Sequence, residues 1–140
     1  MREIVFIDTN AFFKSRAILE KLIKEGTKLA TSSIVIYEFV KIIDELIALE
    51  QNEKRRQLYI KLKNRFPKLL KELSIDILSH QITYDDLSRA YDIISQKNVD
   101  IGDALIYILM KKKNIKKILT FDDDWLRLDV TVLGIKTKKS

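Results

Sequence analysis

The chain contains no cysteine and only three glycines, one proline and one histidine. Without cysteine it cannot form disulfides or thiolate metal sites, and this composition is typical of a reducing compartment such as the cytoplasm. The glycines stand alone at Gly26, Gly102 and Gly134, so there is no G-x-G-x-x-G motif for dinucleotide binding. A charged-then-apolar leader and a long uncharged apolar run are also lacking, so the sequence predicts neither a signal peptide nor a membrane span. We therefore expect a cytoplasmic protein.

The residues that are present fit one domain with a basic surface. The chain has 140 residues, of which 46% are hydrophobic, and this is enough for a real core. The net charge of +6 favours a polyanionic partner such as nucleic acid, although many lysine-rich proteins bind none. No repeat or linker divides the chain. We predict one domain over residues 1–135 and a basic tail without folding signals at 136–140.

Apolar segments of strand and helix type alternate along the chain. The predicted strands cover residues 4–7, 28–31, 75–78, 117–121 and 130–133. The predicted helices cover residues 11–25, 33–50, a segment after 56 that Pro67 ends or kinks, 83–98 and 100–113. Such alternation predicts a parallel sheet with helices on both faces.

Several helix ends carry recognisable capping residues. Ser32 or Ser33 is expected to cap the helix over 33–50, and Thr83 with Asp86 has the spacing of a capping box. The helix over 33–50 is apolar around most of its circumference, which predicts packing on both sides by the sheet and by another helix or a second copy of the chain.

Four acidic residues follow predicted strands or begin predicted helices. Asp8 ends the first strand, Glu38 lies in the second turn of one helix and Asp103 in the first turn of another, and Asp122 follows the fourth strand. Strand carboxyl ends and helix N-termini share one edge of a parallel sheet, so these side chains can meet there. Crowded carboxylates repel each other unless a cation compensates, and an oxygen-only site selects Mg²⁺ or Mn²⁺. Such ions support phosphodiester hydrolysis.

Each of these acidic residues also has a simpler structural interpretation. Asp8 has the position of a helix cap, Glu38 lies on a polar stripe, and Asp103 has the spacing of a partner to an Asp100 cap. Asp122 begins the run Asp122–Asp124, which suits the start of a short helix. Each acidic residue taken alone is only modest evidence for a functional site. Their predicted position at the same edge of the sheet is what favours a common function.

Other residues argue against alternative functions. A haloacid-dehalogenase phosphatase would have an Asp two residues after Asp8, where Asn10 stands, and the fixed residues of a receiver domain are missing. His80 follows the third predicted strand, where a surface or capping role is expected. Lys111–Lys113 is expected to be a solvated helix end, with RNA-backbone contact as the alternative.

Four short motifs occur in order over nearly the whole chain: residues 7–10, 32–39, 102–106 and 119–125. Together they resemble the PIN-domain ribonucleases, and most closely the VapC-type toxins of prokaryotic toxin–antitoxin pairs. The resemblance implies an α/β fold, a three-layer α/β/α sandwich with a central parallel sheet of strand order 3-2-1-4-5. It also implies a Mg²⁺- or Mn²⁺-dependent endoribonuclease that acts on RNA, forms a homodimer and is inhibited by a cognate antitoxin.

The same resemblance assigns roles to individual residues. It implies that the catalytic and metal-binding quartet is Asp8, Glu38, Asp103 and Asp122. The accessory positions that it implies are Asn10, Thr120 and Asp124. Trp125 stands where the family usually has Phe, and no member of the quartet is missing, so an active nuclease is expected.

Two other functions stay open on the sequence alone. One is a house-keeping RNA-processing nuclease of the same family. The other is a PIN-like module that binds RNA or a partner without cleaving, which the apolar helix over 33–50 favours because such a surface suits protein contact.

Overall fold

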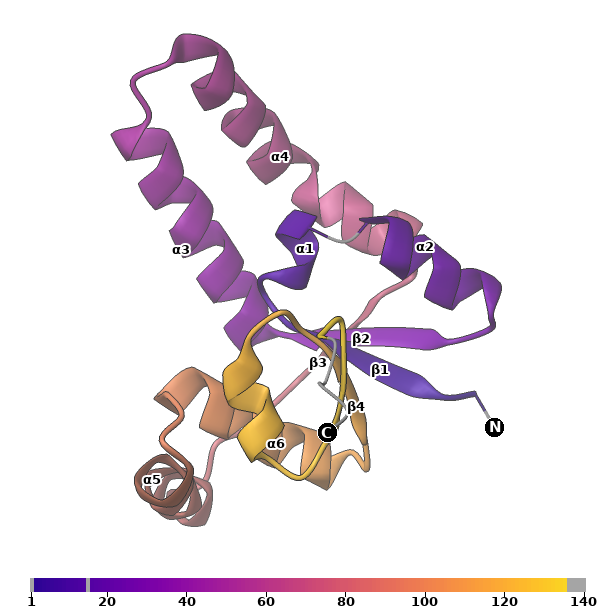
Figure 1. The fold of residues 1–140 in the computed structure, drawn as a ribbon, viewed down its shortest axis with the longest axis vertical. Coiled ribbons are helices and arrows are strands. Elements are labelled where there is room, and N and C mark those ends of the chain that lie inside the picture. Colours follow the sequence, from indigo (N-terminus) through magenta and orange to yellow (C-terminus); the bar gives the residue numbers. More distant parts are fainter. Residues whose placement is uncertain (1, 15, 136–140) are drawn as a thin grey trace.

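The computed structural model describes residues 2–14 and 16–135, so the predicted basic tail at 136–140 lies outside the described residues. Five parallel strands form one sheet in the order β3-β2-β1-β4-β5 (Figure 1). Helices α1 to α4 lie on one side of this sheet, and α5 and α6 lie on the other (Figure 1). The predicted α/β/α fold and its strand order are therefore confirmed. None of the described helices is long and apolar enough to cross a membrane.

The elements follow the predicted alternation closely. The strands are β1 (Ile4–Ile7), β2 (Lys28–Ser32), β3 (Asp76–Leu78), β4 (Lys117–Leu119) and β5 (Thr131–Leu133). The helices are α1 (Ala11–Lys14), α2 (Arg16–Lys24), α3 (Ser33–Leu49), α4 (Glu53–Glu72), α5 (Tyr84–Lys97), α6 (Ile101–Lys112) and the 3₁₀ helix η1 (Asp123–Arg127). The predicted first helix is therefore divided into α1 and α2, and the fourth strand ends before Thr120.

Strand β1 lies at the centre of the sheet. Val5, Phe6 and Ile7 are fully buried, and Phe6 pairs with Ala30 of β2 on one side and with Ile118 of β4 on the other. Apolar residues on both faces of the strand suit this position, because helices cover both faces of the sheet. The residue that follows this strand is therefore held by the most rigid part of the core.

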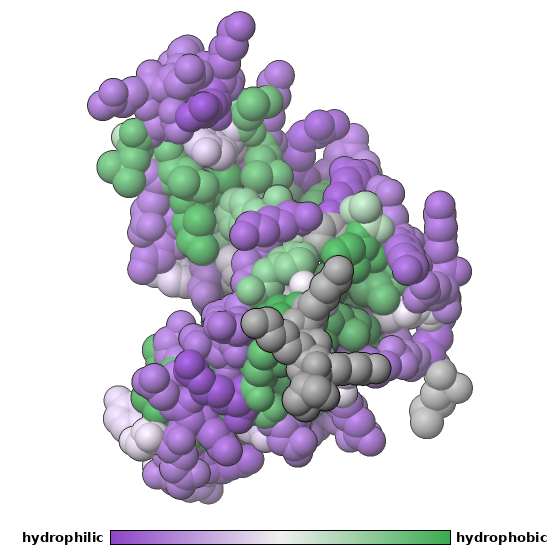
Figure 2. Space-filling model, viewed as in Figure 1, coloured by the Kyte–Doolittle hydropathy of each residue, from purple (hydrophilic) through white to green (hydrophobic). Residues whose placement is uncertain are grey.

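Helices α3 and α4 form a hairpin that projects away from the sheet (Figure 1). Phe39 of α3 stacks on Phe66 of α4 with their ring centroids 3.8 Å apart. The neighbouring helix predicted for α3 is therefore α4. Tyr37 and Leu49 on other faces of α3 are exposed, and Figure 2 shows hydrophobic residues gathered over this hairpin. Part of the apolar surface predicted to be buried thus has no partner within the described residues.

Helix α4 continues through Pro67 to Glu72, so of the two predicted effects of Pro67, an end of the helix or a kink, the end of the helix is wrong. Proline removes one backbone hydrogen bond from a helix interior. Phe66 and Leu70 are buried on either side of it, and their packing against the core holds the chain helical across the lost bond.

The predicted caps are present in most places. Ser32 is the N-cap of α3, although its hydroxyl makes no capping hydrogen bond, and Asn98 ends α5 in the left-handed conformation with φ of 55°. Thr83 and Asp86 form the predicted reciprocal capping box of α5.

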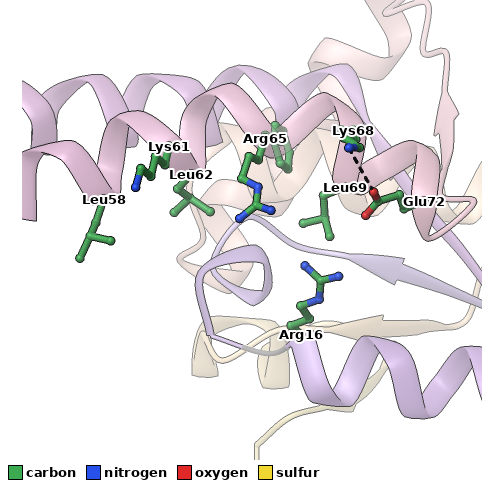
Figure 3. Close-up of a pocket in the computed structure, with 9 residues that line it drawn as sticks. Arg16, Leu58, Lys61, Leu62, Arg65, Lys68, Leu69 and Glu72 are labelled. Atoms are coloured by element: carbon green, nitrogen blue, oxygen red, sulfur yellow. Dashed lines mark ion pairs between the residues drawn. The ribbon is translucent and has the colours of Figure 1, made fainter.

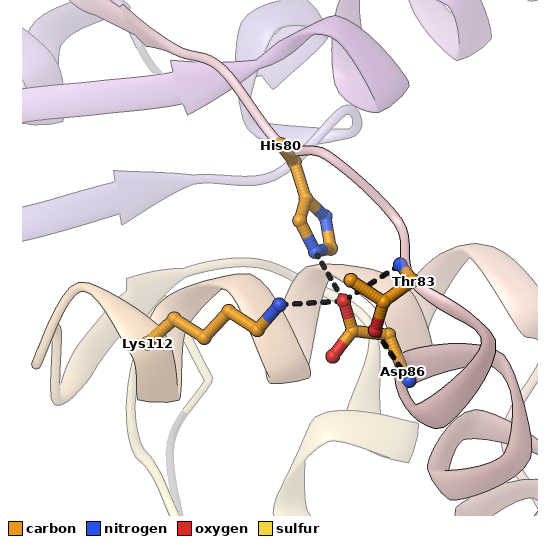
Figure 4. Close-up of polar contacts among 4 residues, drawn as sticks. All are labelled: His80, Thr83, Asp86 and Lys112. Carbon is orange, nitrogen blue, oxygen red and sulfur yellow. Dashed lines mark hydrogen bonds and ion pairs between the residues drawn. The ribbon is translucent and has the colours of Figure 1, made fainter.

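The position of His80 differs from the sequence prediction. Its side chain is only 3% exposed and its Nε2 lies 3.9 Å from Oδ2 of Asp86, so the expected surface role is wrong. Lys112 of α6 donates to the same Oδ2 at 2.5 Å (Figure 4). Burial and the nearby Lys112 lower the pKa of His80, which favours the neutral ring. Asp86 therefore joins the start of α5 to the end of α6 beneath His80.

We expect Asp86→Asn to lower the melting temperature by several degrees. The hydrogen bond from Lys112 and the backbone bond from Thr83 lower the pKa of Asp86 to about 2, below its ordinary 3.8. This stabilisation is present above pH 4 and is lost as the pH falls from about 4 to 2. Circular dichroism at pH 7 measures the change, with the exposed neighbour Asp85→Asn as the matched control. Equal melting temperatures for the two variants would contradict this account.

Candidate metal centre

Asp8 follows the carboxyl end of β1, and hydrogen bonds fix both its backbone N–H and its carboxylate. Its backbone N–H donates to the Leu119 carbonyl of β4 at 3.0 Å, which extends the sheet by one residue. Its Oδ1 accepts from the Thr9 N–H and its Oδ2 accepts from the Thr120 hydroxyl, both at 2.8 Å. The residue is 5% exposed, and burial raises its pKa against the effect of these hydrogen bonds. The carboxylate is therefore fixed in place and costly to ionise without a cation.

Asn10 and Thr120, the two predicted polar accessory residues, join the ends of β1 and β4. Oδ1 of Asn10 accepts from the Phe121 N–H at 3.0 Å, and its Nδ2 donates to the Thr120 hydroxyl at 3.4 Å. The same hydroxyl accepts from the Asp122 N–H at 3.1 Å. Thr120 thus contacts both Asp8 and the backbone of Asp122, and it sets the distance between the two segments.

Asp122 caps the short helix η1 and also lies within the acidic cluster. Its Oδ1 accepts from the Asp124 N–H at 2.9 Å, so the simpler capping interpretation is correct. A carboxylate oxygen from each of Asp103, Asp122 and Asp124 lies within 4.8 Å of the other two. The cap therefore does not remove Asp122 from this group of close oxygens, which includes Asp124 and one other quartet residue, Asp103.

Asp103 lies in the first turn of α6, under its N-cap Asp100. Oδ1 of Asp100 accepts from the Asp103 N–H at 2.8 Å, which caps α6. Asp103 is 6% exposed. Burial raises its pKa to about 8, and the charges of Asp100, Asp8, Asp122 and Glu38 add to the effect. This carboxyl is protonated at neutral pH unless a cation is bound.

Glu38 reaches the cluster from the second turn of α3. Its Oε1 is buried and has no hydrogen-bond donor among the described residues. Burial raises the pKa of Glu38 to about 7, with further increases from Asp8 and Asp100. Gly102 makes room for it, since a Cβ at position 102 would lie 3.1 Å from this oxygen. The polar-stripe interpretation therefore fails for Glu38, because its carboxyl group points into the protein.

The structure thus brings all four residues of the predicted quartet to one edge of the sheet. Asp103, Asp122 and Asp124 have the closest oxygens, and electrostatic effects on pKa connect Asp8 and Glu38 to them. Asp100 is the residue that sequence reasoning missed, because it was assigned only a capping role. Among the charged neighbours of Asp103, it has the largest effect on the pKa. Its position one helical turn before Asp103 was the available signal.

The chemistry of this edge suits a hard divalent cation. The ligands are carboxylate oxygens alone, and the chain has no cysteine and no histidine at this edge. An orphaned buried oxygen on Glu38 and raised pKa values at three carboxyls show that positive charge is lacking. Mg²⁺ or Mn²⁺ bound here would relieve this repulsion.

Comparison with known families and structures agrees with the geometry. The family model for the PIN domain matches residues 5–130, and no curated protein matches the chain. The solved structure of PAE2754 from Pyrobaculum aerophilum shares 17% identity and has a TM-score of 0.69, with 94% of this chain and 83% of that chain covered.

Two further solved structures are also similar in fold. VapBC2 from Rickettsia felis, bound to a DNA fragment from its promoter, shares 19% identity over 93% of this chain and 97% of the other, with a TM-score of 0.58. FitAcB from Neisseria gonorrhoeae shares 19% identity over 93% and 96% of the two chains, with a TM-score of 0.61.

Proposed function

The chain belongs to the PIN-domain family, and on that premise we propose that it is a Mg²⁺- or Mn²⁺-dependent endoribonuclease. The observation that carries the proposal is the convergence of Asp8, Glu38, Asp103 and Asp122 at one edge of the sheet, with the pKa raised to about 7 at Glu38 and about 8 at Asp103. The net charge of +6 supports a polyanionic substrate.

The proposed roles follow from how each side chain is held. Asp8, Asp103 and Asp122 would hold the cation, and Asp8 is oriented for this by the Thr9 N–H and the Thr120 hydroxyl. The bound metal supplies an activated water and stabilises the leaving oxygen. The unpartnered Oε1 of Glu38 is available to bind the ion or to accept a proton from the attacking water. In-line attack would leave a 5′-phosphate and a 3′-hydroxyl.

A cleavage assay on end-labelled structured RNA tests this proposal. We expect cleavage with Mg²⁺ or Mn²⁺, no cleavage with EDTA, and products that carry a 5′-phosphate. RNA binding without turnover under either ion would instead favour a non-cleaving PIN-like module. The exposed Tyr37 and Leu49 of α3 support that second candidate, and they equally suit a homodimer contact.

We further propose that the chain is the toxin of a toxin–antitoxin pair and that it works in the cytoplasm. The support is the resemblance of the four sequence motifs to VapC-type toxins, together with the shared fold with VapBC2 of Rickettsia felis. Growth arrest on expression in a bacterial host would favour a toxin. Normal growth together with maturation of a defined cellular RNA would favour a house-keeping nuclease.

A groove between α2 and α4 is a suitable contact surface for an antitoxin. It encloses a cavity of about 300 Å³, and Figure 3 shows Arg16 of α2 facing Arg65 and Leu69 of α4 across it. Leucine and basic side chains alternate along its α4 wall. That wall is formed by Leu58, Lys61, Leu62, Arg65, Phe66, Lys68, Leu69 and Glu72. Among the described residues, Lys61 and Arg65 form no ion pair, so the groove suits an amphipathic helix with acidic side chains.

We expect the double substitution Lys61→Glu and Arg65→Glu to weaken inhibition by the antitoxin at least about tenfold, because like charges would then face each other. Titration of RNA cleavage with the product of the adjacent antitoxin gene measures the change. Lys54→Glu on an exposed part of the same helix is the matched control. Unchanged inhibition of the double variant would exclude this groove as the contact surface.

A further inference from the structure

Arg127, the last residue of η1, contacts two segments that carry carboxylates of the metal centre. Its Nη1 lies 3.0 Å from Oδ1 of Asp124, within the same short helix. The same nitrogen donates to the Asn98 carbonyl at 2.8 Å, in the turn between α5 and α6. One guanidinium nitrogen therefore joins two segments that lie 29 residues apart in the sequence.

The turn that Arg127 contacts determines where Asp103 lies. Asn98 ends α5 in the left-handed conformation, and Asp100 two residues later caps α6 by accepting the Asp103 N–H. A shift of the Asn98 carbonyl is therefore transmitted through this short turn to the carboxylate of Asp103. Within residues 2–14 and 16–135, no other hydrogen bond joins η1 to the turn.

The short helix η1, to which Arg127 belongs, carries the other two acidic residues of the group of close oxygens. Asp122 caps η1 and Asp124 lies in its first turn, and their oxygens lie within 4.8 Å of an oxygen of Asp103. The structure joins Asp122 to the sheet through Thr120, whereas the contact of Arg127 with Asn98 joins η1 to α6. The spacing between Asp124 and Asp103 thus depends on Arg127.

We propose that Arg127 is a positioning residue for the divalent cation, an inference that rests on the proposed metal-dependent function. It holds η1 against the α5–α6 turn, so that Asp103 and Asp124 face one ion. It pairs with Oδ1 of Asp124 at 3.0 Å while its second contact, the Asn98 carbonyl, lies in the turn before α6. Arg127 itself does not contact the ion or the RNA in this role.

Replacing Arg127 affects cation binding in two opposite ways, through the lost charge and through the lost positioning, and the second effect is the larger. Removing a half-exposed positive charge beside Asp124 would strengthen cation binding, at most about fivefold for an exposed pair. Loss of a residue that orients metal ligands typically weakens binding by about 10- to 100-fold. The positioning role therefore predicts net weaker binding when Arg127 is replaced.

The test compares Arg127→Gln and Arg127→Lys with Arg56→Gln as the matched control. Arg56 has the same 46% side-chain exposure and also pairs with an acid three residues earlier, but it lies on α4. Isothermal titration with Mn²⁺ reports binding, and hydrogen exchange without metal reports protection of residues 98–103. Circular dichroism confirms that each variant folds.

We expect Arg127→Gln to bind Mn²⁺ about tenfold more weakly and to exchange faster over residues 98–103. Arg127→Lys should restore most of both properties, because an ammonium group can donate to the same two acceptors, and Arg56→Gln should match the wild type. Unchanged or tighter Mn²⁺ binding by Arg127→Gln would overturn the proposal, as would unchanged exchange. If the wild-type protein binds no Mn²⁺, the proposed function fails, and the exchange result alone decides whether Arg127 holds the turn.

Discussion

Asp8→Asn is expected to lower metal-dependent RNA cleavage on the order of 10³-fold, because a carboxylate proposed to hold the cation loses its charge. The fold should survive, since the amide oxygen can accept from the Thr9 N–H in place of Oδ1, and the amide NH2 in place of Oδ2 can donate to the Thr120 hydroxyl, which accepts as well as donates. Burial raises the pKa of Asp8, which means that its ionised form is disfavoured in the metal-free protein. The neutral variant should therefore melt at the same temperature as the wild type or higher. Initial cleavage rates and thermal melts measure the two effects.

Asp123→Asn is the matched control for this experiment. Asp123 belongs to the same acidic run but is absent from the group of close oxygens formed by Asp103, Asp122 and Asp124. Its substitution changes the net charge as Asp8→Asn does, and cleavage should stay near the wild-type rate. Cleavage that persists in Asp8→Asn and in the presence of EDTA would exclude a metal-dependent reaction at this edge.

The metal-free protein is expected to lose stability as the pH rises from 6.5 to 8.5. The folded pKa values of Glu38 and Asp103, about 7 and about 8, lie above their ordinary values of 4.5 and 3.8. The folded state therefore binds more protons than the unfolded state over this range, and unfolding becomes easier as those protons leave. Asp103 contributes about 2 kcal/mol, and half-exposed Glu38 contributes less because solvent screens it. The melting temperature should fall by roughly 5 °C.

Metal binding should show the opposite dependence on pH. The ion must displace protons from Asp103 and Glu38, so Mn²⁺ affinity should rise between pH 6.5 and 8.5. Calorimetry in buffers of different ionisation enthalpy counts the released protons, and Asp103→Asn should release fewer. Measurements below pH 6.5 are avoided because the pKa of His80 is lowered in the folded state, so the unfolded state then binds a proton more readily and the fold loses stability. A melting temperature that rises with pH without metal would contradict the raised pKa values.

Sequence patterns predict the fold well because hydrophobic periodicity is strong throughout. Buried strand β1 and the alternation of strands with helices follow directly from residue types, and Asp8 follows from its place after β1. The burial of Glu38, in contrast, does not follow from residue types alone. The place of Glu38 near the start of a helix put it among the four converging carboxylates, but periodicity equally placed it on a polar stripe, because its burial depends on Gly102 of a distant helix.

The features that the sequence did not reveal depend on tertiary contacts. An end or a kink of the helix was expected at Pro67, but α4 does not end there, because buried neighbours hold it helical through Pro67. His80 was expected at the surface, but the segment after β3 carries it over Asp86 and Lys112. Arg127 resembles any surface arginine in sequence, since its second contact is a backbone carbonyl of another segment. No local pattern encodes such a contact.

Asp100 and Asp122 each cap a helix as well as contributing charge to the acidic edge. Asparagine caps helices about as well as aspartate does, so an amide at either position would keep the architecture and remove the charge. Architecture and cation chemistry are thus separable by single-nucleotide changes, since one base converts an Asp codon to an Asn codon. Proteins with this fold could therefore lose the proposed RNA cleavage during evolution and keep RNA binding, while every intermediate sequence still folds.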